Sequence, residues 1–216
     1  MTILDVLEKK RISILVEHTS EDILGPTIFD IIKKVKDKYG DSIGIIITDF
    51  LDTLAIYKYQ AELLDLDTSI IENAAIIKVG GKINVGNVLH KIPVSAYPVY
   101  KTLYEEALGK VLTTLPKGTF SINIQLGIEN IMNIFDKKEL IEQVHDIGEY
   151  IVTKEIDIRD IVFLNVDAIK KVSVEVLSML RMIFPVVIRV IDDGHSFVVK
   201  KSVFPELKGA RGKVIE

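Results

Sequence analysis

Residues 17–27 carry a carboxylate, a base and several hydroxyls within one short segment that follows an apolar run. In α/β proteins, groups of this kind gather beyond the carboxyl ends of strands, where ligands bind. The carboxylates would suit a neutral or cationic ligand better than a phosphate. The residues that predict this small polar pocket are Glu17, His18, Ser20, Gly25, Thr27 and, after the next apolar run, Asp49.

Helix capping explains the same segment without a ligand. Thr19, Ser20 or Asp22 can accept hydrogen bonds from the first N–H groups of the helix that follows, and the acids would stabilise its positive end. Asp49 can cap the next helix in the same way. Capping and ligand binding are therefore two interpretations of the same residues.

The remaining polar residues fit no catalytic or metal-binding pattern. The chain has no cysteine, which excludes disulfides and thiolate chemistry. Its four histidines lack the spacing of metal ligands, and no Ser-His-Asp set can be assigned. Gly80-Gly81-Lys82 is glycine-rich, but no helix is expected to begin after it, so it predicts a turn. We therefore predict no catalytic residue, no metal and no cofactor.

Apolar runs and amphipathic segments alternate along most of the chain, which predicts an α/β fold with a mostly parallel sheet. Strands are expected at residues 12–16, 43–48, 74–79, 83–90, 120–125 and 161–166. Helices are expected at residues 3–9, 26–39, 51–64, 99–112, 137–153 and 174–183. Segments 186–191 and 196–201 flank Asp193-Gly194, which predicts a C-terminal antiparallel hairpin. Since the sequence contains no linker or repeat, residues 1–216 are expected to form a single three-layer domain.

The order of these elements resembles the RecA-type branch of the P-loop NTPases, and most closely the KaiC-related archaeal proteins. In that arrangement the segment from Ser20 to Thr27 occupies the position of the phosphate loop. Residues 120–125 correspond to the magnesium-binding strand, 161–166 to the strand after it, and 186–201 to the closing hairpin. The chain also resembles a small archaeal family of uncharacterised proteins of about this length. The resemblance implies a RecA-like fold and surfaces for self-assembly.

Both nucleotide-binding motifs of the RecA-like proteins, Walker A and Walker B, are degenerate in this sequence. The phosphate loop needs G-x-x-x-x-G-K-[ST], but Ser20 replaces the first glycine and Pro26 replaces the lysine. Two acids follow Ser20, and each would cost on the order of a few kcal/mol beside a phosphate. The magnesium position falls on Asn123 or Gln125, and neither supplies an anionic ligand. We therefore do not expect ATP hydrolysis.

Composition restricts the setting of the protein. The formal net charge is −4, which disfavours broad binding to nucleic acid or to membranes. The apolar runs are shorter than the roughly 20 residues of a spanning helix, and the N-terminal segment does not resemble a signal peptide. A cytoplasmic location is therefore expected. The abundance of lysine, glutamate and isoleucine, with few glutamines, resembles the bias of hyperthermophilic proteins.

Two functional classes follow from these observations. The first, which we favour, is a non-hydrolysing RecA-like module for interaction or assembly, acting as a homo-oligomer or with a protein partner. The second is a small-ligand-binding protein or enzyme that uses the remodelled pocket at the former phosphate loop. A weak nucleotide binder is a further alternative.

Overall fold

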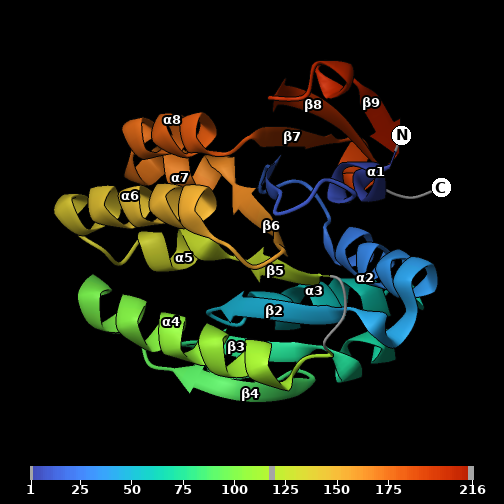
Figure 1. The fold of residues 1–216 in the computed structure, drawn as a ribbon, viewed down its shortest axis with the longest axis horizontal. Helices are drawn as coiled ribbons and strands as arrows, with labels where there is room; N and C mark the ends of the chain where they lie inside the picture. Colours follow the sequence, from blue (N-terminus) through green and yellow to red (C-terminus); the bar gives the residue numbers. More distant parts are fainter. Residues whose placement is uncertain (1, 117–119, 214–216) are drawn as a thin grey trace.

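A nine-stranded sheet forms the centre of the computed structural model, which describes residues 2–116 and 120–213 (Figure 1). Its strands lie in the order β4-β3-β2-β5-β6-β1-β7-β8-β9. The first seven of these are parallel to their neighbours, whereas β8 and β9 pair antiparallel at one edge. The predicted mostly parallel sheet with a C-terminal antiparallel hairpin is confirmed.

The strands and helices alternate along the chain as the apolar pattern requires. The strands are β1 (Ser13–His18), β2 (Gly44–Phe50), β3 (Ala75–Val79), β4 (Asn87–Ile92), β5 (Ser121–Leu126), β6 (Ile158–Asn165), β7 (Val186–Ile191), β8 (Ser196–Ser202) and β9 (Arg211–Lys213). The helices are α1 (Ile3–Leu7), α2 (Gly25–Tyr39), α3 (Thr53–Glu62), α4 (Tyr97–Thr114), α5 (Ile128–Met132), α6 (Lys137–Thr153), α7 (Val166–Val172) and α8 (Val174–Ile183).

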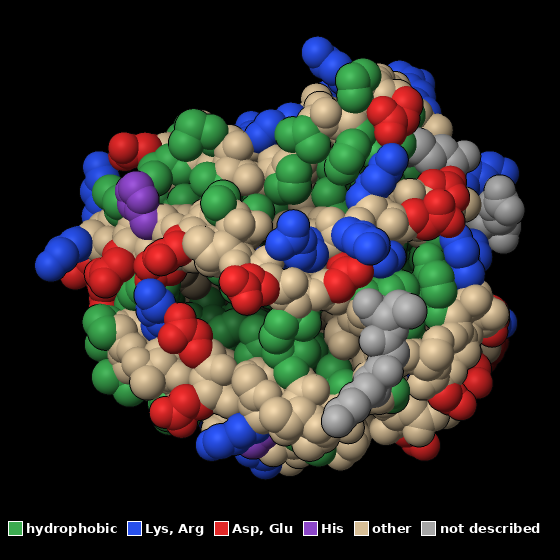
Figure 2. Space-filling view, in the orientation of Figure 1, with side chains coloured by type: hydrophobic (Ala, Val, Ile, Leu, Met, Phe, Trp, Pro, Cys, Tyr) green, Lys and Arg blue, Asp and Glu red, His purple; other side chains and the backbone are tan. Residues whose placement is uncertain are grey.

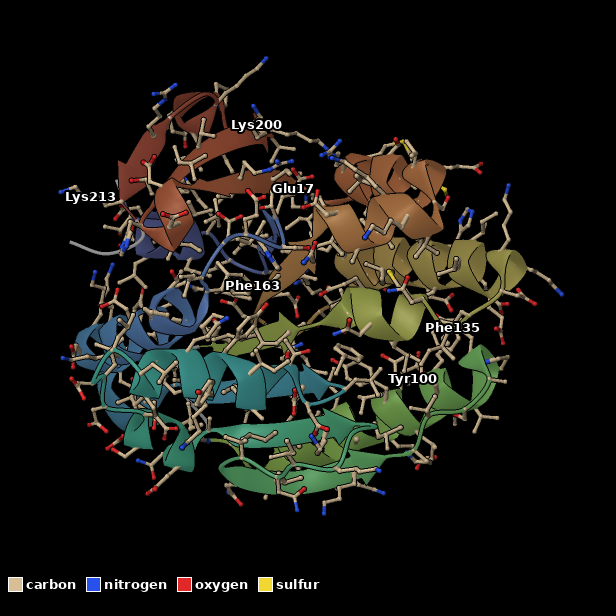
Figure 3. The ribbon with its side chains drawn as sticks, turned by 180° about the vertical axis from the view of Figure 1, so that it is seen from behind. Glu17, Tyr100, Phe135, Phe163, Lys200 and Lys213 are labelled. Atoms are coloured by element: carbon tan, nitrogen blue, oxygen red, sulfur yellow. The ribbon has the colours of Figure 1, made fainter. Side chains whose placement is uncertain are left out.

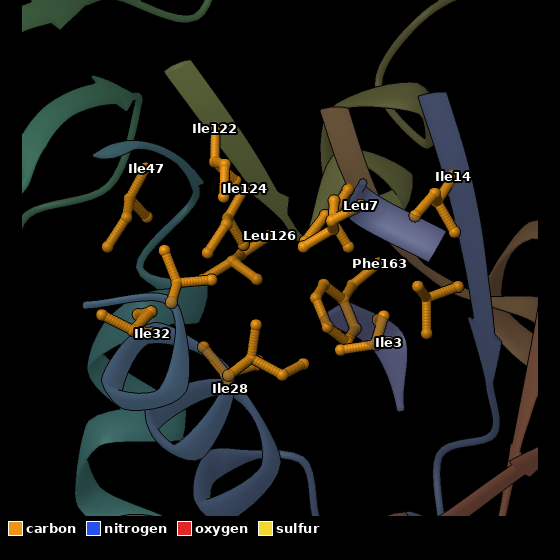
Figure 4. Packing of buried hydrophobic residues seen from close by; sticks show 14 of the residues in the cluster. Ile3, Leu7, Ile14, Ile28, Ile32, Ile47, Ile122, Ile124, Leu126 and Phe163 are labelled. Carbon is orange, nitrogen blue, oxygen red and sulfur yellow. The ribbon is translucent and has the colours of Figure 1, made fainter. Parts of the chain in front are cut away.

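Helices cover both faces of the sheet, and each face has its own apolar core. On one face, α1, α2 and α3 pack on alternate residues of the central strands, as Ile28, Ile47 and Phe163 illustrate (Figure 4). On the other face, α4 to α8 pack on the intervening residues, such as Leu15 and Ile46. The alternation follows from the two-residue period of a strand, and it assigns every strand side chain to one face.

Some sequence-based boundaries were wrong, and proline and capping residues explain two of them. A helix was expected at residues 99–112, but α4 already begins at Tyr97, because Pro98 is tolerated in the first helical turn. The short helix α7 was missed; its N-terminus is capped by Asn165, whose side chain accepts from the N–H groups of Asp167 and Ala168. Strand β9 was also missed, since its three residues carry no apolar alternation.

The ends of two strands bear directly on the predicted pocket. Glu17 and His18 lie within β1, not in the loop after it, and Asp49 lies within β2. Between these two strands the sheet contains β5 and β6. The residues proposed for one pocket therefore come from strands separated by roughly 14 Å, about three strand spacings.

Candidate functional site

The loop between β1 and α2 holds its backbone through its own side chains and those of two neighbouring helices. Asp22 accepts hydrogen bonds from the N–H and hydroxyl of Thr19, at 2.6 and 2.8 Å. The N–H of Ser20 donates to Asp167 of α7 at 3.2 Å, and the N–H of Gly25 donates to Oε1 of Gln60 in α3 at 3.0 Å. These N–H groups are directed at protein acceptors, so they are not free for an anion.

The hydroxyl of Thr27, which would face magnesium in a working phosphate loop, is also occupied. It donates to the carbonyl oxygen of Gly194 at 2.9 Å, in the turn between β7 and β8. Gly194 has a φ of +98°, and a Cβ there would lie 2.7 Å from the carbonyl oxygen of Ile23. Glycine is required at this turn because the hairpin packs closely against the loop.

Glu17 is buried in an arginine clamp. Its carboxylate contacts Arg181 of α8, and it accepts from Nη2 of Arg189 in β7 at 2.7 Å. Burial raises the pKa of Glu17, but the hydrogen bonds and charges of the two arginines outweigh it and hold the pKa below its usual value. Both carboxylate oxygens are already paired, which leaves this residue a structural anion.

Asp49 belongs to a second buried ion cluster. Nζ of Lys78 in β3 lies 2.9 Å from Asp49 and also contacts Asp52, while Asp49 accepts from the N–H of Leu54 at 2.9 Å. Burial lowers the pKa of Lys78, but its two carboxylate partners raise it further than burial lowers it. The contact with Leu54 places Asp49 at the first turn of α3, where a carboxylate stabilises the positive end of a helix.

His18 is the one predicted pocket residue with an unsatisfied atom that the described structure reveals. Its Nδ1 lies 3.0 Å from the carbonyl oxygen of Thr19, whereas its buried Nε2 has no partner among the described residues. Burial lowers the pKa of His18, against the opposing influence of the Thr19 carbonyl and nearby acids. The imidazole is therefore held mainly neutral.

The structure places Ser20 in the loop between β1 and α2, with Gly25 and Thr27 in the first turn of α2, and it separates Glu17 in β1 from Asp49 in β2. Glu17 pairs with α8 on one face of the sheet, whereas Asp49 contacts α3 on the other. The two carboxylates therefore point to opposite faces of the sheet. The pocket of six residues stays a prediction. In the structure these residues form a loop and the first turn of a helix, with the ion pairs of Glu17 and Asp49 on either side.

Glu129, which the sequence analysis did not single out, lies just after β5 at the same end of the sheet. It is 4% exposed, and its Oε2 has no hydrogen-bond partner among the described residues. Burial raises the pKa of Glu129 to about 7, while backbone N–H groups of Glu129 and Asn165 lower it by less. No local pattern marked this residue, since a glutamate in a first helical turn is ordinarily exposed.

The polar side chains of β5, the strand that corresponds to the magnesium-binding strand, lie on the face of the sheet that α4 to α8 cover. Asn123 is buried, and its Nδ2 donates to Asp160 at 3.1 Å. The Oδ1 of Asn123 accepts from Oγ1 of Thr48 at 3.2 Å. Gln125 lies beside them and lines a cavity on the α4–α8 face of the sheet. These side chains therefore lie on the face of the sheet opposite α2.

That cavity, which we call the α4–α6 cleft, has a volume of about 130 Å³. Figure 2 shows it as a hollow of apolar surface with charged groups around it. Aromatic side chains project from the helices on either side, and Tyr100 lies near Phe135 with ring centroids 6.0 Å apart (Figure 3). Its aromatic and amide lining is Tyr97, Tyr100, Tyr104, Tyr150, Phe184, Asn123, Gln125 and Gln143.

A buried polar network forms the floor of the α4–α6 cleft. Lys154 lies 2.6 Å from Asp160 and also donates to the hydroxyl of Ser13 at 2.8 Å. Asp160 in turn accepts from Ser13, Asn123 and, at 3.5 Å, from the hydroxyl of Tyr150. Because every partner is paired, the floor is rigid and leaves the cleft with a fixed shape.

The strand order is β7-β1-β6-β5-β2, so that one strand, β6, lies between the strand before the loop and the strand that corresponds to the magnesium-binding one; this order defines the class of the protein as a RecA/KaiC-like α/β fold. The chain belongs to the family described as "Pyrococcus protein of unknown function, DUF257", whose model matches residues 7–213. The predicted relationship to an uncharacterised archaeal family is confirmed. The chain has no match among proteins of curated function.

Solved structures of three Pyrococcus horikoshii proteins illustrate the fold. The protein studied as PH0250 has a TM-score of 0.84 at 21% identity, with 100% of both chains covered. The uncharacterized protein PH0321, solved in complex with an unknown peptide, has a TM-score of 0.57 at 11% identity over 95% of this chain and 93% of that chain. The KaiC-like protein PH0186 has a TM-score of 0.57 at 10% identity, with coverages of 94% and 85%.

Among the described residues, every helix is too short or too polar to cross a bilayer.

Proposed function

We propose that this protein is a non-hydrolysing RecA-like module whose role is interaction or assembly. The observation that carries the proposal is the closed loop between β1 and α2. The N–H groups of Ser20 and Gly25 and the hydroxyl of Thr27 are bound to Asp167, Gln60 and the Gly194 carbonyl. To bind a phosphate, the loop would have to break these contacts without the lysine that normally compensates.

A binding role is also supported by a protein of the same fold. PH0321 was solved in complex with an unknown peptide. For the present chain, a peptide partner or a second copy of the chain are both consistent with a RecA-like module. The proposal places the interaction away from the loop, because the loop's donors are committed to internal contacts.

Thermal unfolding with nucleotides tests the proposal. A ligand that binds only the native state raises the melting temperature. We expect no shift with ATP, ADP or GTP in the presence of magnesium, and no ATP turnover. A magnesium-dependent shift with ATP would contradict the closed loop.

A triple variant gives this test a positive control. Ser20→Gly together with Pro26→Lys restores the glycine and lysine of the motif, while Asp167→Ala frees the N–H at position 20. We expect a nucleotide-dependent shift in the combined variant and none in the unmodified protein. A shift of equal size in the unmodified protein would show that the loop opens readily, which would favour the alternative of a weak nucleotide binder.

A second candidate function is small-ligand binding, or an enzymatic reaction, at the former phosphate loop. The observation in its favour is the buried Nε2 of His18, which has no partner among the described residues. A ligand that donates a hydrogen bond there would satisfy it. Perturbation of the His18 ring signals in NMR by such a ligand, together with loss of ligand binding in a His18→Gln variant, would support this second function.

We also propose that the chain folds as one domain, assembles with itself or with a protein partner, lies in the cytoplasm and comes from a thermophilic setting. The continuous sheet from β4 to β9 supports the single domain, and the lysine- and glutamate-rich composition supports the thermophilic setting. Light scattering tests assembly. If the protein is strictly monomeric at high concentration, the proposal of self-assembly fails and only the proposal of a protein partner stands.

A further inference from the structure

We propose that the α4–α6 cleft is a binding site for a small organic amine: an apolar, ring-sized body that carries one positive charge. The cleft lies on the face of the sheet opposite α2 and α3, and nucleotide binding by the loop between β1 and α2 does not involve it. The proposal therefore stands or falls independently of the closed loop. Size, wall chemistry and charge each contribute to it.

The size of the cleft sets the size of the occupant. A dry engineered cavity of about 150 Å³ binds benzene. The cleft, at about 130 Å³, is similar, and it opens at the molecular surface, as Figure 2 shows. It therefore fits one ring or a short aliphatic body, with the remainder of the molecule at the mouth.

The walls favour a cation over a neutral compound. Four tyrosine rings line the cleft, and Tyr100 stacks on Tyr104 with centroids 5.9 Å apart. The hydroxyls of three are used internally: Tyr97 donates to Asp146 at 2.7 Å, Tyr104 lies 3.1 Å from Thr48, and Tyr150 contacts the floor. What these rings offer a ligand is their faces, and the face of an aromatic ring attracts a cation.

One buried acceptor in the cleft lacks a donor among the described residues. Gln143 is 3% exposed and lines the cleft, and its Oε1 has no hydrogen-bond partner. Unsatisfied buried polar atoms are costly, and an ammonium group supplies three donors.

The charges at the mouth add a preference for positive charge. Glu105 and Asp146 line the cleft together with Lys101, whose Nζ lies 2.9 Å from Asp146. Glu142 lies close enough to raise the pKa of Tyr97, and Glu149 close enough to raise that of Lys101. These five side chains carry four negative charges and one positive charge, so the local potential repels a carboxylate and attracts an ammonium.

The experiment compares three ligands that share a phenyl ring and a two-carbon chain and differ mainly in charge: phenethylamine, 2-phenylethanol and phenylacetate. Calorimetric titration of the full-length protein at low salt should give the tightest binding for the amine, weaker binding for the alcohol and the weakest for the acid. The proposal is overturned if the acid binds as tightly as the amine, or if none of the three binds.

Two matched pairs of variants locate the site. Glu105→Lys reverses a charge that lines the cleft and should weaken amine binding about fivefold relative to the alcohol, whereas Glu106→Lys, on the next residue, should not. Ile151→Trp fills the cleft and should abolish binding of all three compounds. Val152→Trp, at a residue that is 82% exposed, should leave binding unchanged. Equal effects of the two variants in either pair would show that the ligand binds elsewhere. If Ile151→Trp does not fold, the comparison of Glu105→Lys with Glu106→Lys still locates the site.

Discussion

The loop between β1 and α2 and the α4–α6 cleft differ in whether their polar groups are bound to one another. At the loop between β1 and α2, polar groups face one another: Asp22 with Thr19, Ser20 with Asp167, Thr27 with Gly194. In the α4–α6 cleft, the polar groups of the floor are paired, while tyrosine rings line the space above it and Oε1 of the cleft-lining Gln143 has no partner among the described residues. A concave site keeps its ligand-binding capacity only where the groups around it are not satisfied by each other.

The largest expected effect comes from the floor of the cleft. Lys154→Met would leave Asp160 buried and without its cation, and breaking a buried pair in this way costs about 3–5 kcal/mol. Denaturant unfolding should show this loss. Lys110→Met, at a side chain that is 65% exposed, should change the unfolding free energy by less than about 0.5 kcal/mol. Similar small losses in both variants would mean that the floor is not the rigid element we infer.

The next effect depends on pH and concerns Glu129. Its pKa is raised from 4.5 to about 7 in the folded protein, so folding favours the neutral carboxyl. The contribution of this group to stability is therefore complete below about pH 4.5, declines as pH rises towards 7 and is constant above. At about 1.4 kcal/mol per pKa unit, the decline amounts to about 3 kcal/mol.

Glu129→Gln removes this dependence. The variant should be more stable than the parent at pH 8, by up to about 3 kcal/mol, and equally stable near pH 4. Urea unfolding at the two pH values provides the measurement. A constant difference at both pH values would show that Glu129 ionises normally and that its burial does not shift its titration.

The closure of the loop by the β7–β8 turn should be sensitive to one methyl group. In Gly194→Ala, the positive φ and the approach of Cβ to the Ile23 carbonyl both oppose folding, with an expected cost of about 1–3 kcal/mol. Gly209→Ala is the matched control, because Gly209 also has a positive φ but no atom within 4 Å of its Cβ position. Its cost should be about 1 kcal/mol, and equal costs would mean that the contact with the loop contributes nothing.

The sequence predicted the helices and strands better than it predicted their lateral arrangement. The positions of α6 and α8 were predicted without error, because Leu140, Val144 and Ile147 repeat at helical spacing and capping residues precede the helices. The parallel sheet followed from the apolar strands. The apolar periodicity carries no information on the lateral order of the strands. That order places β5 and β6 between the strands of Glu17 and Asp49.

The α4–α6 cleft was not predicted, because its lining comes from distant parts of the chain. Tyr97, Tyr100 and Tyr104 have the spacing of one helical face, which is also the spacing of an ordinary core. The expected start of that helix at residue 99 also left Tyr97 outside it. Ser13 and Asp160, which meet at the floor, are 147 residues apart in the chain. Only the folded sheet brings them together.

The smallest effect tests whether the loop is closed by single hydrogen bonds. In Gln60→Ala, the N–H of Gly25 loses its acceptor, and a lost bond of this kind costs about 1 kcal/mol. Tyr59→Ala, on the neighbouring and 61% exposed residue, serves as the control for the same helix. The freed N–H lies at the start of α2, where an anion is favoured. Sulfate should therefore stabilise Gln60→Ala more than the parent protein, as measured by the melting temperature. If sulfate stabilises both proteins equally, the loop is already open to anions, and the contrast between a closed loop and an open cleft does not hold.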